Sequence, residues 1–327
     1  MFIRALNLGR FATVAFAVLA AGCASGAGGA SVSGASGGGL PPSQAAKPAS
    51  ESQQKLYIAN LGGSVLVYSA GKNPQLLQTI TDGVPAPFSL WVDDTGILYV
   101  INGTYRSDSP NVAEYQPGAD SPFFVLTNDI PNFGYVAVDS SQNVYLTGEI
   151  GSDGKSILEL YPKGSSNPSE TLNAPTSGKL SGSDTLTFDP SGDLLIGIQS
   201  LEKTDDAVFR LPPGSQTFTN LGLKKMPAAQ IAADAAGNIY AGGGGDDGIR
   251  TIAVYAPGQT KPSRRIRLSQ LTTGVNALTV SADGTLYVAT QVSTQKVIYE
   301  YAPGASKPDV TLDIAASVEG EGLALSP

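Results

Sequence analysis

The fold is decided by the stretch Asn276–Ile314, NALTVSADGTLYVATQVSTQKVIYEYAPGASKPDVTLDI, in which short apolar or β-branched runs alternate with turn residues. Ser281–Gly284 and Pro303-Gly304 are turn sequences, because glycine adopts the positive φ that a tight reversal needs and proline fixes φ at the corner before it. The runs between these turns predict four strands, Ala277–Val280, Thr285–Ala289, Val297–Tyr301 and Val310–Ile314. Four such short strands do not bury both faces of their sheet alone. The unit is therefore expected to pack against further copies of itself.

Copies of this unit recur along the chain. The second-strand tyrosine, replaced once by leucine, recurs at Tyr57, Tyr99, Tyr145, Leu195, Tyr240 and Tyr287. A turn residue precedes it by six positions in five copies, at Asp93, Asp139, Asp189, Asp234 and Ser281. A glycine turn follows the third strand six times, at Gly71, Gly118, Gly164, Gly214, Gly258 and Gly304. Four-stranded repeats of about 40–50 residues are typical of propeller blades. The sequence thus predicts an all-β fold, a six-bladed β-propeller with four antiparallel strands per blade.

The two ends of the repeat region complement each other. Glu321–Pro327 (EGLALSP) matches a first strand, with Ser326 in the place of Ser281. Leu56–Ile58 matches a second strand. We therefore expect the C-terminal strand to join the N-terminal blade as its innermost strand, which closes the ring and leaves no unpaired edge between blades.

The chain before the repeats has the composition of a leader and a tether. Residues 1–22 combine a positive start (Arg4 and Arg10), the apolar run Phe11–Leu19 and the small residues AAG before Cys23, so they predict a signal peptide. AAGC resembles a bacterial lipobox, in which the cysteine is lipidated, although leucine is commoner at the first position; an ordinary secretory signal is the alternative. Residues 23–52 are rich in Gly, Ala, Ser and Pro and predict a flexible tether. Residues 53–327 are the expected propeller, exported and lipid-anchored to the bacterial cell envelope.

The pattern AxDxxGxIYVA followed by VxxYAPGxxxP resembles the NHL-type repeats of bacterial extracytoplasmic six-bladed propellers, over Lys55–Pro327. Proteins of similar architecture include the regucalcin- and gluconolactonase-type hydrolases, the streptogramin lyases and many binding proteins. The resemblance implies the fold and leaves the activity open. Streptogramin lyases are understood to rely on histidine, which this chain lacks, so the resemblance does not extend to their activity.

The composition excludes several kinds of chemistry. Without histidine, the chain offers no histidine general base, no Ser-His-Asp triad and no His-ligated zinc. Cys23 is the only cysteine and lies outside the repeats, so neither an intrachain disulfide nor a cysteine nucleophile is expected. The leader holds two of the 20 basic residues and no acidic one, which leaves 18 basic against 28 acidic residues and a net charge of −10. This charge argues against a nucleic-acid partner, because such binding depends on neutralising phosphates.

Propellers usually bind ligands at the end of the central channel where the innermost strands begin. Counting back from the turn residues places one ring of side chains there, Glu321, Phe88, Gly134, Asp184, Ala229 and Asn276, and a neighbouring ring, Gly322, Ser89, Tyr135, Thr185, Gln230 and Ala277. Glu321, Asp184 and Asn276 carry oxygen ligands of the kind that Ca²⁺ or another divalent cation takes. The resemblance to regucalcin-like hydrolases implies that these three residues would be partial counterparts of the metal ligands of those enzymes, without a full set of four. The competing interpretation is that they are solvated residues of a water-filled channel.

Three functions follow as hypotheses. The leading one is a non-enzymatic module that binds a protein, peptide or glycan at the channel mouth and touches the membrane only through its lipid, with no catalytic residue assigned. The alternative is a divalent-metal-dependent hydrolase, a lactonase or esterase of regucalcin type, with the metal on Glu321, Asp184 and Asn276. A structural envelope protein without a discrete ligand is the third. If the first is right, loop changes such as at Asp205 and Asp206 should matter more than the channel ring.

Overall fold

The computed structural model describes residues 54–103, 110–127, 132–150, 155–173, 175, 185–198, 207–226, 230–244, 250–268, 274–292, 295–314 and 320–327. At 132, 133, 149, 150, 155, 244, 291, 292, 320 and 321 it describes the backbone alone. All of these residues lie within the unit Ser50–Pro327. The predicted leader, Cys23 and the tether lie outside them, so those interpretations stay predictions.

The described residues form six antiparallel sheets of four strands each. The innermost strands are β24 (Gly320–Leu325), β4 (Pro87–Val92), β8 (Asn132–Val138), β12 (Thr185–Phe188), β16 (Gln230–Ala233) and β20 (Val275–Val280). The second strands are β1 (Lys55–Asn60), β5 (Leu98–Asn102), β9 (Val144–Ile150), β13 (Leu194–Ile198), β17 (Ile239–Gly244) and β21 (Leu286–Val292). The third strands are β2 (Ser64–Ser69), β6 (Asn111–Tyr115), β10 (Lys155–Tyr161), β14 (Ala207–Leu211), β18 (Arg250–Tyr255) and β22 (Gln295–Tyr301). The outermost strands are β3 (Leu76–Ile80), β7 (Phe124–Thr127), β11 (Glu170–Asn173), β15 (Thr219–Asn220), β19 (Arg264–Arg267) and β23 (Val310–Ile314).

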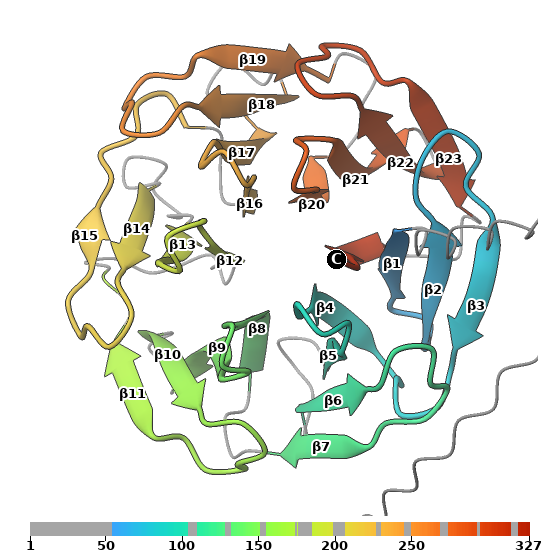
Figure 1. Ribbon diagram of the computed structural model, residues 1–327, viewed down its shortest axis with the longest axis vertical. Coiled ribbons are helices and arrows are strands. Elements are labelled where there is room, and N and C mark those ends of the chain that lie inside the picture. Colours follow the sequence, from blue (N-terminus) through green and yellow to red (C-terminus); the bar gives the residue numbers. More distant parts are fainter. Residues whose placement is uncertain are drawn as a thin grey trace, which may run out of the picture. The chain divides into compact units, whose positions relative to one another are not determined.

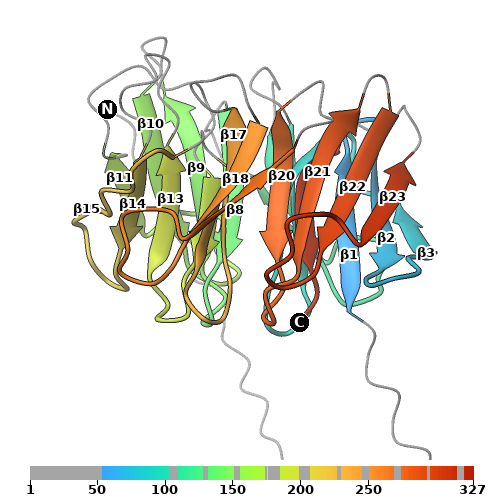
Figure 2. The same ribbon diagram turned by 90° about the horizontal axis from the view of Figure 1, so that it is seen from above.

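The sheets stand as blades around a central axis. The innermost strands of successive sheets contact one another in a closed ring, from β24 through β4, β8, β12, β16 and β20 back to β24. Figure 1 looks down this axis, and Figure 2 shows from the side that the strands run roughly along it. We number the blades 1 to 6 from the one that contains β24 and β1. The start face is the one at which the innermost strands begin, and the turn face is the one at which they end. The predicted six-bladed β-propeller is confirmed.

An aspartate holds the turn between the first and second strands. In blade 5, Asp234 Oδ1 accepts hydrogen bonds from the backbone N–H groups of Ala236 (3.0 Å) and Asn238 (2.9 Å). Its Oδ2 accepts from Asn238 Nδ2 (2.8 Å) and from the Tyr240 hydroxyl (3.0 Å). Asp93 and Asp139 bind their turns and their tyrosines, Tyr99 and Tyr145, in the same way. The spacing of six residues therefore has a structural cause. It places the tyrosine of the second strand within hydrogen-bond distance of the aspartate in the preceding turn.

The predicted glycine turns between third and outermost strands all have positive φ, at Gly71, Gly118, Gly164, Gly214, Gly258 and Gly304, with values from 68° to 97°. At the corresponding glycine position of the turn between first and second strands, blade 3 carries Gln142, whose φ is 62°. A non-glycine residue is strained in this region. Gln142 Nε2 donates hydrogen bonds to Asp93 Oδ2 (2.6 Å) and Thr95 Oγ1 (3.1 Å) of blade 2. The unusual conformation thus links two neighbouring blades.

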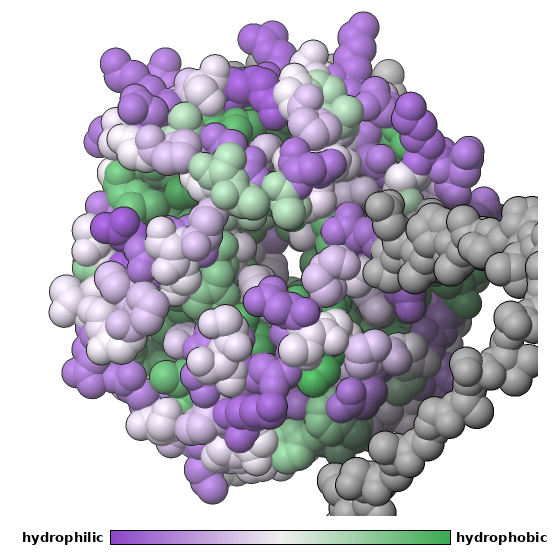
Figure 3. Space-filling view, viewed as in Figure 1, coloured by the Kyte–Doolittle hydropathy of each residue, from purple (hydrophilic) through white to green (hydrophobic). Residues whose placement is uncertain are grey.

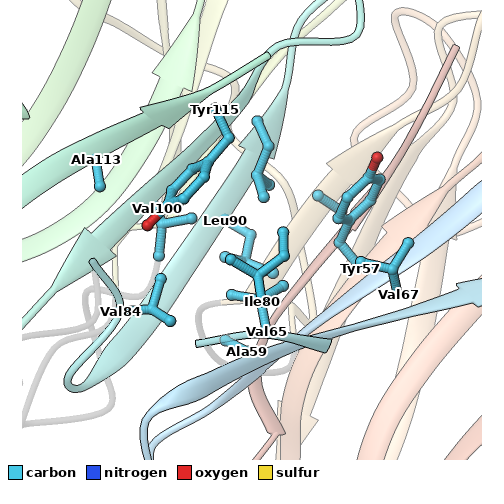
Figure 4. Packing of buried hydrophobic residues seen from close by; sticks show 12 residues of the cluster. Tyr57, Ala59, Val65, Val67, Ile80, Val84, Leu90, Val100, Ala113 and Tyr115 are labelled. Carbon is cyan, nitrogen blue, oxygen red and sulfur yellow. The ribbon is translucent and has the colours of Figure 1, made fainter. Parts of the chain in front are cut away.

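The hydrophobic core lies between the blades. Figure 4 shows the cluster between blades 1 and 2, in which Tyr57, Val65 and Ile80 of one blade face Leu90, Val100 and Tyr115 of the next. These side chains are at most 5% exposed. Burial of an aliphatic side chain of this size contributes about 1.5–3 kcal/mol. Each blade is therefore stabilised mainly by its neighbours, as the sequence predicted.

The ring closes as predicted, with β24 paired antiparallel to β1. Tyr57 lies opposite Ala324 and Ile58 opposite Leu323. Ser326 Oγ accepts a hydrogen bond from the backbone N–H of Lys55 (2.9 Å), just as Ser281 Oγ accepts one from Thr285 (3.0 Å) in blade 6. In Figure 1 the C-terminal strand (red) lies beside the first strand (blue). Residues from both ends of the chain therefore form one blade.

Two arginines of β19 join blade 5 to both of its neighbours. Arg264 Nη1 donates to the backbone oxygen of Ala305 in blade 6 (2.9 Å), and Arg265 Nη2 donates to that of Lys225 after blade 4. These side chains satisfy backbone carbonyls rather than form a free basic patch. Within the part of the chain that the structure describes, no helix has the length and hydropathy needed to cross a bilayer.

Candidate functional site

The candidate site is the central channel. A cavity of about 320 Å³ runs along the axis and is lined by residues of all six innermost strands. The view onto the turn face in Figure 3 shows an opening at the centre, with hydrophilic and hydrophobic surface around it. Each innermost strand has only one strand neighbour, so its free backbone edge faces the axis. The channel wall therefore combines backbone groups with the side chains that flank them.

β-Bulges occur where the innermost strands begin. Phe88 is the extra residue in β4 and Asn276 the extra residue in β20, while β8 is bulged at Gly134-Tyr135 and β24 at Glu321-Gly322. These are members of the two rings predicted from the sequence. A bulge changes the direction of a side chain and is common beside functional sites. β12 and β16 pair with their second strands without such a shift.

The neighbouring ring lines the channel: Gly322, Ser89, Tyr135, Thr185, Gln230 and Ala277. Of the described members of the first ring, Phe88, Gly134 and Asn276, none lines the cavity. The bulges explain this difference between the two rings. A residue inserted into a strand changes which of its side chains face the channel. Ala229 and Asp184 lie outside the described residues, as does the side chain of Glu321.

Tyr135 and Gln230 meet across the channel wall. Gln230 Nε2 of blade 5 donates a hydrogen bond to the Tyr135 hydroxyl of blade 3 (2.8 Å), although blade 4 lies between them in the ring. The Phe88 ring packs edge-on against the Tyr135 ring, with centroids 5.8 Å apart. Ser89 Oγ accepts a long hydrogen bond from the backbone N–H of Val136 (3.4 Å). Blades 2, 3 and 5 thus form a group of amide, hydroxyl and aromatic side chains near the start face.

Trp91 also lies along the channel. Its side chain is half-buried, and its ring packs edge-on against Phe188 of blade 4, with centroids 6.0 Å apart. Trp91 packs against the hydrophobic clusters between blades 2 and 3 and between blades 3 and 4. Its Nε1 is buried and has no hydrogen-bond partner among the described residues.

The predicted metal ligands are described only in part. Asn276 is half-buried on β20, at the bulge, and makes a polar interaction of its own. Within the described residues, no three acidic or cysteine side chains gather closely enough to hold a metal ion. Because Asp184 and the Glu321 side chain are outside the description, the predicted trio of metal ligands remains a prediction. The acidic loop residues Asp205 and Asp206 lie outside it as well.

The aspartate and tyrosine side chains of the repeat instead hold the turns within the blades. The pKa of Tyr240 is raised to about 12, first by burial and then by the charge of Asp234. The pKa of Tyr145 is raised to about 12 for the same reasons, with Asp139 as the charge. These phenols keep their protons at neutral pH and serve as hydrogen-bond donors to the turns. Along the channel itself, the only charged residue that the structure describes is the exposed Asp94, on the turn face.

Fold and site together define a six-bladed β-propeller whose channel carries neutral polar and aromatic groups. No known protein family matches the sequence, and no curated protein matches it. Solved structures do resemble it. A chain from a nidogen/laminin complex has 14% identity and a TM-score of 0.63, over 84% of this chain and 98% of that one. TolB from Acinetobacter baumannii has 11% identity and a TM-score of 0.62, over 84% of this chain and 66% of TolB. A protein of unknown function from Bacteroides caccae has 11% identity and a TM-score of 0.59, over 84% and 99%. At these identities the likeness concerns the fold alone.

Proposed function

We propose that this protein is a binding module of the bacterial cell envelope, anchored by lipid at Cys23, and that its channel mouth binds a protein, peptide or glycan. The observation that carries the proposal is the group formed by Phe88, Tyr135 and Gln230. The proposal thus rests on the channel ring and not on the loop with Asp205 and Asp206, which lies outside the described residues. Hydroxyl, amide and aromatic groups in a partly apolar cavity are what orients an uncharged polar ligand. The propeller fold is compatible with a protein-interaction module, since it also occurs in a nidogen/laminin complex.

The size of the site supports the same proposal. A cavity of about 320 Å³ is at the lower end of the range for small-ligand sites, about 300–1,000 Å³. A ligand that accepts from Gln230 Nε2 would displace the Tyr135 oxygen and leave that oxygen able to accept a hydrogen bond from the ligand. The hydrogen bond between Tyr135 and Gln230 is thus a preformed pair that a sugar or peptide group can replace on both sides.

The test uses glycan and peptide arrays, followed by calorimetric titration of any hit. We expect a bound glycan or peptide to lose about tenfold or more in affinity in Tyr135→Ala, because both stacking and hydrogen bonding are removed. The control is Lys72→Ala, which changes an exposed residue in the turn between β2 and β3 of blade 1. This variant should bind the ligand as the unaltered protein does. A ligand whose affinity is the same in Tyr135→Ala and Lys72→Ala would contradict binding at the channel mouth.

The alternative is the metal-dependent hydrolase, favoured by the bulges that set Asn276 and Glu321 apart from the regular strand pairing. Its test is thermal unfolding with calcium, with magnesium and with chelator, since a ligand of the native state raises the melting temperature. The hydrolase proposal expects a calcium-dependent rise that Asp184→Ala removes. An unchanged melting temperature with either ion would leave the binding module as the better account.

The lipid anchor has a separate test. Cys23→Ser is expected to move the protein from the detergent phase to the aqueous phase in a detergent partition experiment, because the acyl chains are then missing. Equal partition of both forms would contradict the anchor and leave the binding proposal untouched.

A further inference from the structure

A second cavity opens on the turn face between blades 4 and 5. It has a volume of about 400 Å³ and is lined by Leu195, Leu221, Leu223 and Pro257, together with Asp189 and Arg210. The corresponding interface between blades 3 and 4 carries Tyr145 where this one carries Leu195, and its cavity is only about 30 Å³. Blade 4 therefore has a large hollow at a place that its neighbour fills with an aromatic ring.

The missing ring also leaves a hydrogen-bond acceptor without donors. In blades 2, 3 and 5 the Oδ2 atom of the turn aspartate accepts two side-chain hydrogen bonds, one of them from the tyrosine hydroxyl. Asp189 Oδ1 accepts from the backbone N–H groups of Ser191 (2.8 Å) and Asp193 (3.1 Å) as usual. Its Oδ2 has no donor among the described residues. Leucine replaces the tyrosine, and the position of Asn238 is taken by Asp193, which has no N–H in its side chain.

The walls of the cavity are held by neighbouring contacts. The outermost strand of blade 4, β15, has only two residues, and the chain continues toward blade 5. There the backbone N–H of Lys224 donates to Thr260 O (2.7 Å), and the Tyr255 hydroxyl donates to Lys224 O (3.1 Å). These bonds keep Leu221 and Leu223 over the hollow. Arg210 pairs with Asp193 at 3.5 Å, so the remaining charge is the carboxylate of Asp189.

We propose that this cavity, the blade 4–5 cavity, binds a small phenolic molecule whose ring takes the place of the missing tyrosine and whose hydroxyl donates to Asp189 Oδ2. Tyr240 shows the geometry in the next blade, where the same donor and acceptor are 3.0 Å apart. A cavity of about 300–1,000 Å³ that is lined mainly by apolar side chains and carries a few placed polar groups is the usual form of a small-ligand site. The site is independent of the channel.

The experiment is calorimetric titration of the full-length protein with p-cresol, the side-chain analogue of tyrosine. A ligand of this size is expected to bind with a Kd on the order of 1 mM. Toluene, which has the ring and lacks the hydroxyl, should bind about tenfold or more weakly, because a hydrogen bond to a carboxylate is lost. This comparison needs no variant. Equal binding of both compounds, or no saturable binding of p-cresol, would overturn the proposal.

Variants then locate the site. Leu195→Tyr places the ring and the hydroxyl in the cavity and is expected to weaken p-cresol binding at least tenfold. Leu195→Phe fills the same space without the hydroxyl and should do the same. Leu76→Tyr, at a position that is 53% exposed on blade 1, is the matched control and should leave binding unchanged. Circular dichroism confirms that each variant is folded, and p-cresol binding that persists in a folded Leu195 variant would contradict the assignment.

Discussion

Glu114 is a buried carboxyl group that lies between two blades. Its side chain is 6% exposed on β6, opposite Tyr99 of β5. Its pKa is raised to about 7, first by burial and then by the negative charge of Asp93, and Lys163 offsets only part of this. The pKa of Asp93 shifts in the opposite direction. Burial alone would raise it, but hydrogen bonds from Gln142, Thr95 and Ile97 together lower it.

The raised pKa of Glu114 makes stability depend on pH. The unfolded carboxyl ionises near 4.5, whereas the folded one keeps its proton up to about pH 7. Between these values the folded state binds more protons, so the contribution of Glu114 to stability is present below pH 4.5 and is lost as the pH rises through 7. Glu114→Gln, which does not ionise, should raise the free energy of unfolding by up to about 3 kcal/mol at pH 8 and change it little at pH 4.5. Urea unfolding at both pH values measures this, and an equal effect at the two would contradict it.

The sequence predicted elements better than it predicted the direction of side chains within them. The strands and turns could be predicted because their signals are local. Asp234 and Tyr240 are only six residues apart in the chain, and the turn at Gly304 needs a positive φ, which glycine adopts readily. The channel group could not be predicted fully. Gln230 and Tyr135 are 95 residues apart and have no local pattern. The bulges at Phe88 and Asn276 change side-chain directions without changing the apolar pattern that indicates a strand.

The bulge of β24 brings Gly322 against the neighbouring innermost strand. A Cβ atom on Gly322 would lie 2.6 Å from the backbone oxygen of Phe88 and 3.1 Å from the Cα of Ser89. Backbone atoms in a packed ring do not move aside cheaply. Only glycine therefore allows blade 1 to approach blade 2 at this point.

Gly322→Ala is accordingly expected to lower the free energy of unfolding by about 2 kcal/mol or more, as overpacking does. Gly274→Ala is the matched control, because a Cβ there meets nothing within 4 Å, and it should change stability by less than about 0.5 kcal/mol. Urea unfolding compares the two variants. Equal free energies of unfolding for the two variants would contradict the close approach of Gly322 to the backbone of β4.

At the scale of the whole molecule, stability depends on closing the ring. Each hydrophobic cluster joins neighbouring blades, so no blade holds a complete core of its own. The cluster between blades 6 and 1 includes Leu323 together with Ile58 and Tyr287. Gln54 Nε2 adds a hydrogen bond to the backbone oxygen of Ser326 (2.9 Å). The last strand thus joins the two ends of the repeat region in one blade and takes part in the core between blades 6 and 1.

The most direct test of this account is thermal unfolding after deletion of Glu321–Pro327, followed by circular dichroism and calorimetry. Without this segment, β1 loses its inner neighbour and the cores on both sides of blade 1 open to water. We predict that the shortened protein shows no cooperative transition. A sharp transition near the melting temperature of the full-length protein would contradict the closed ring as the basis of stability.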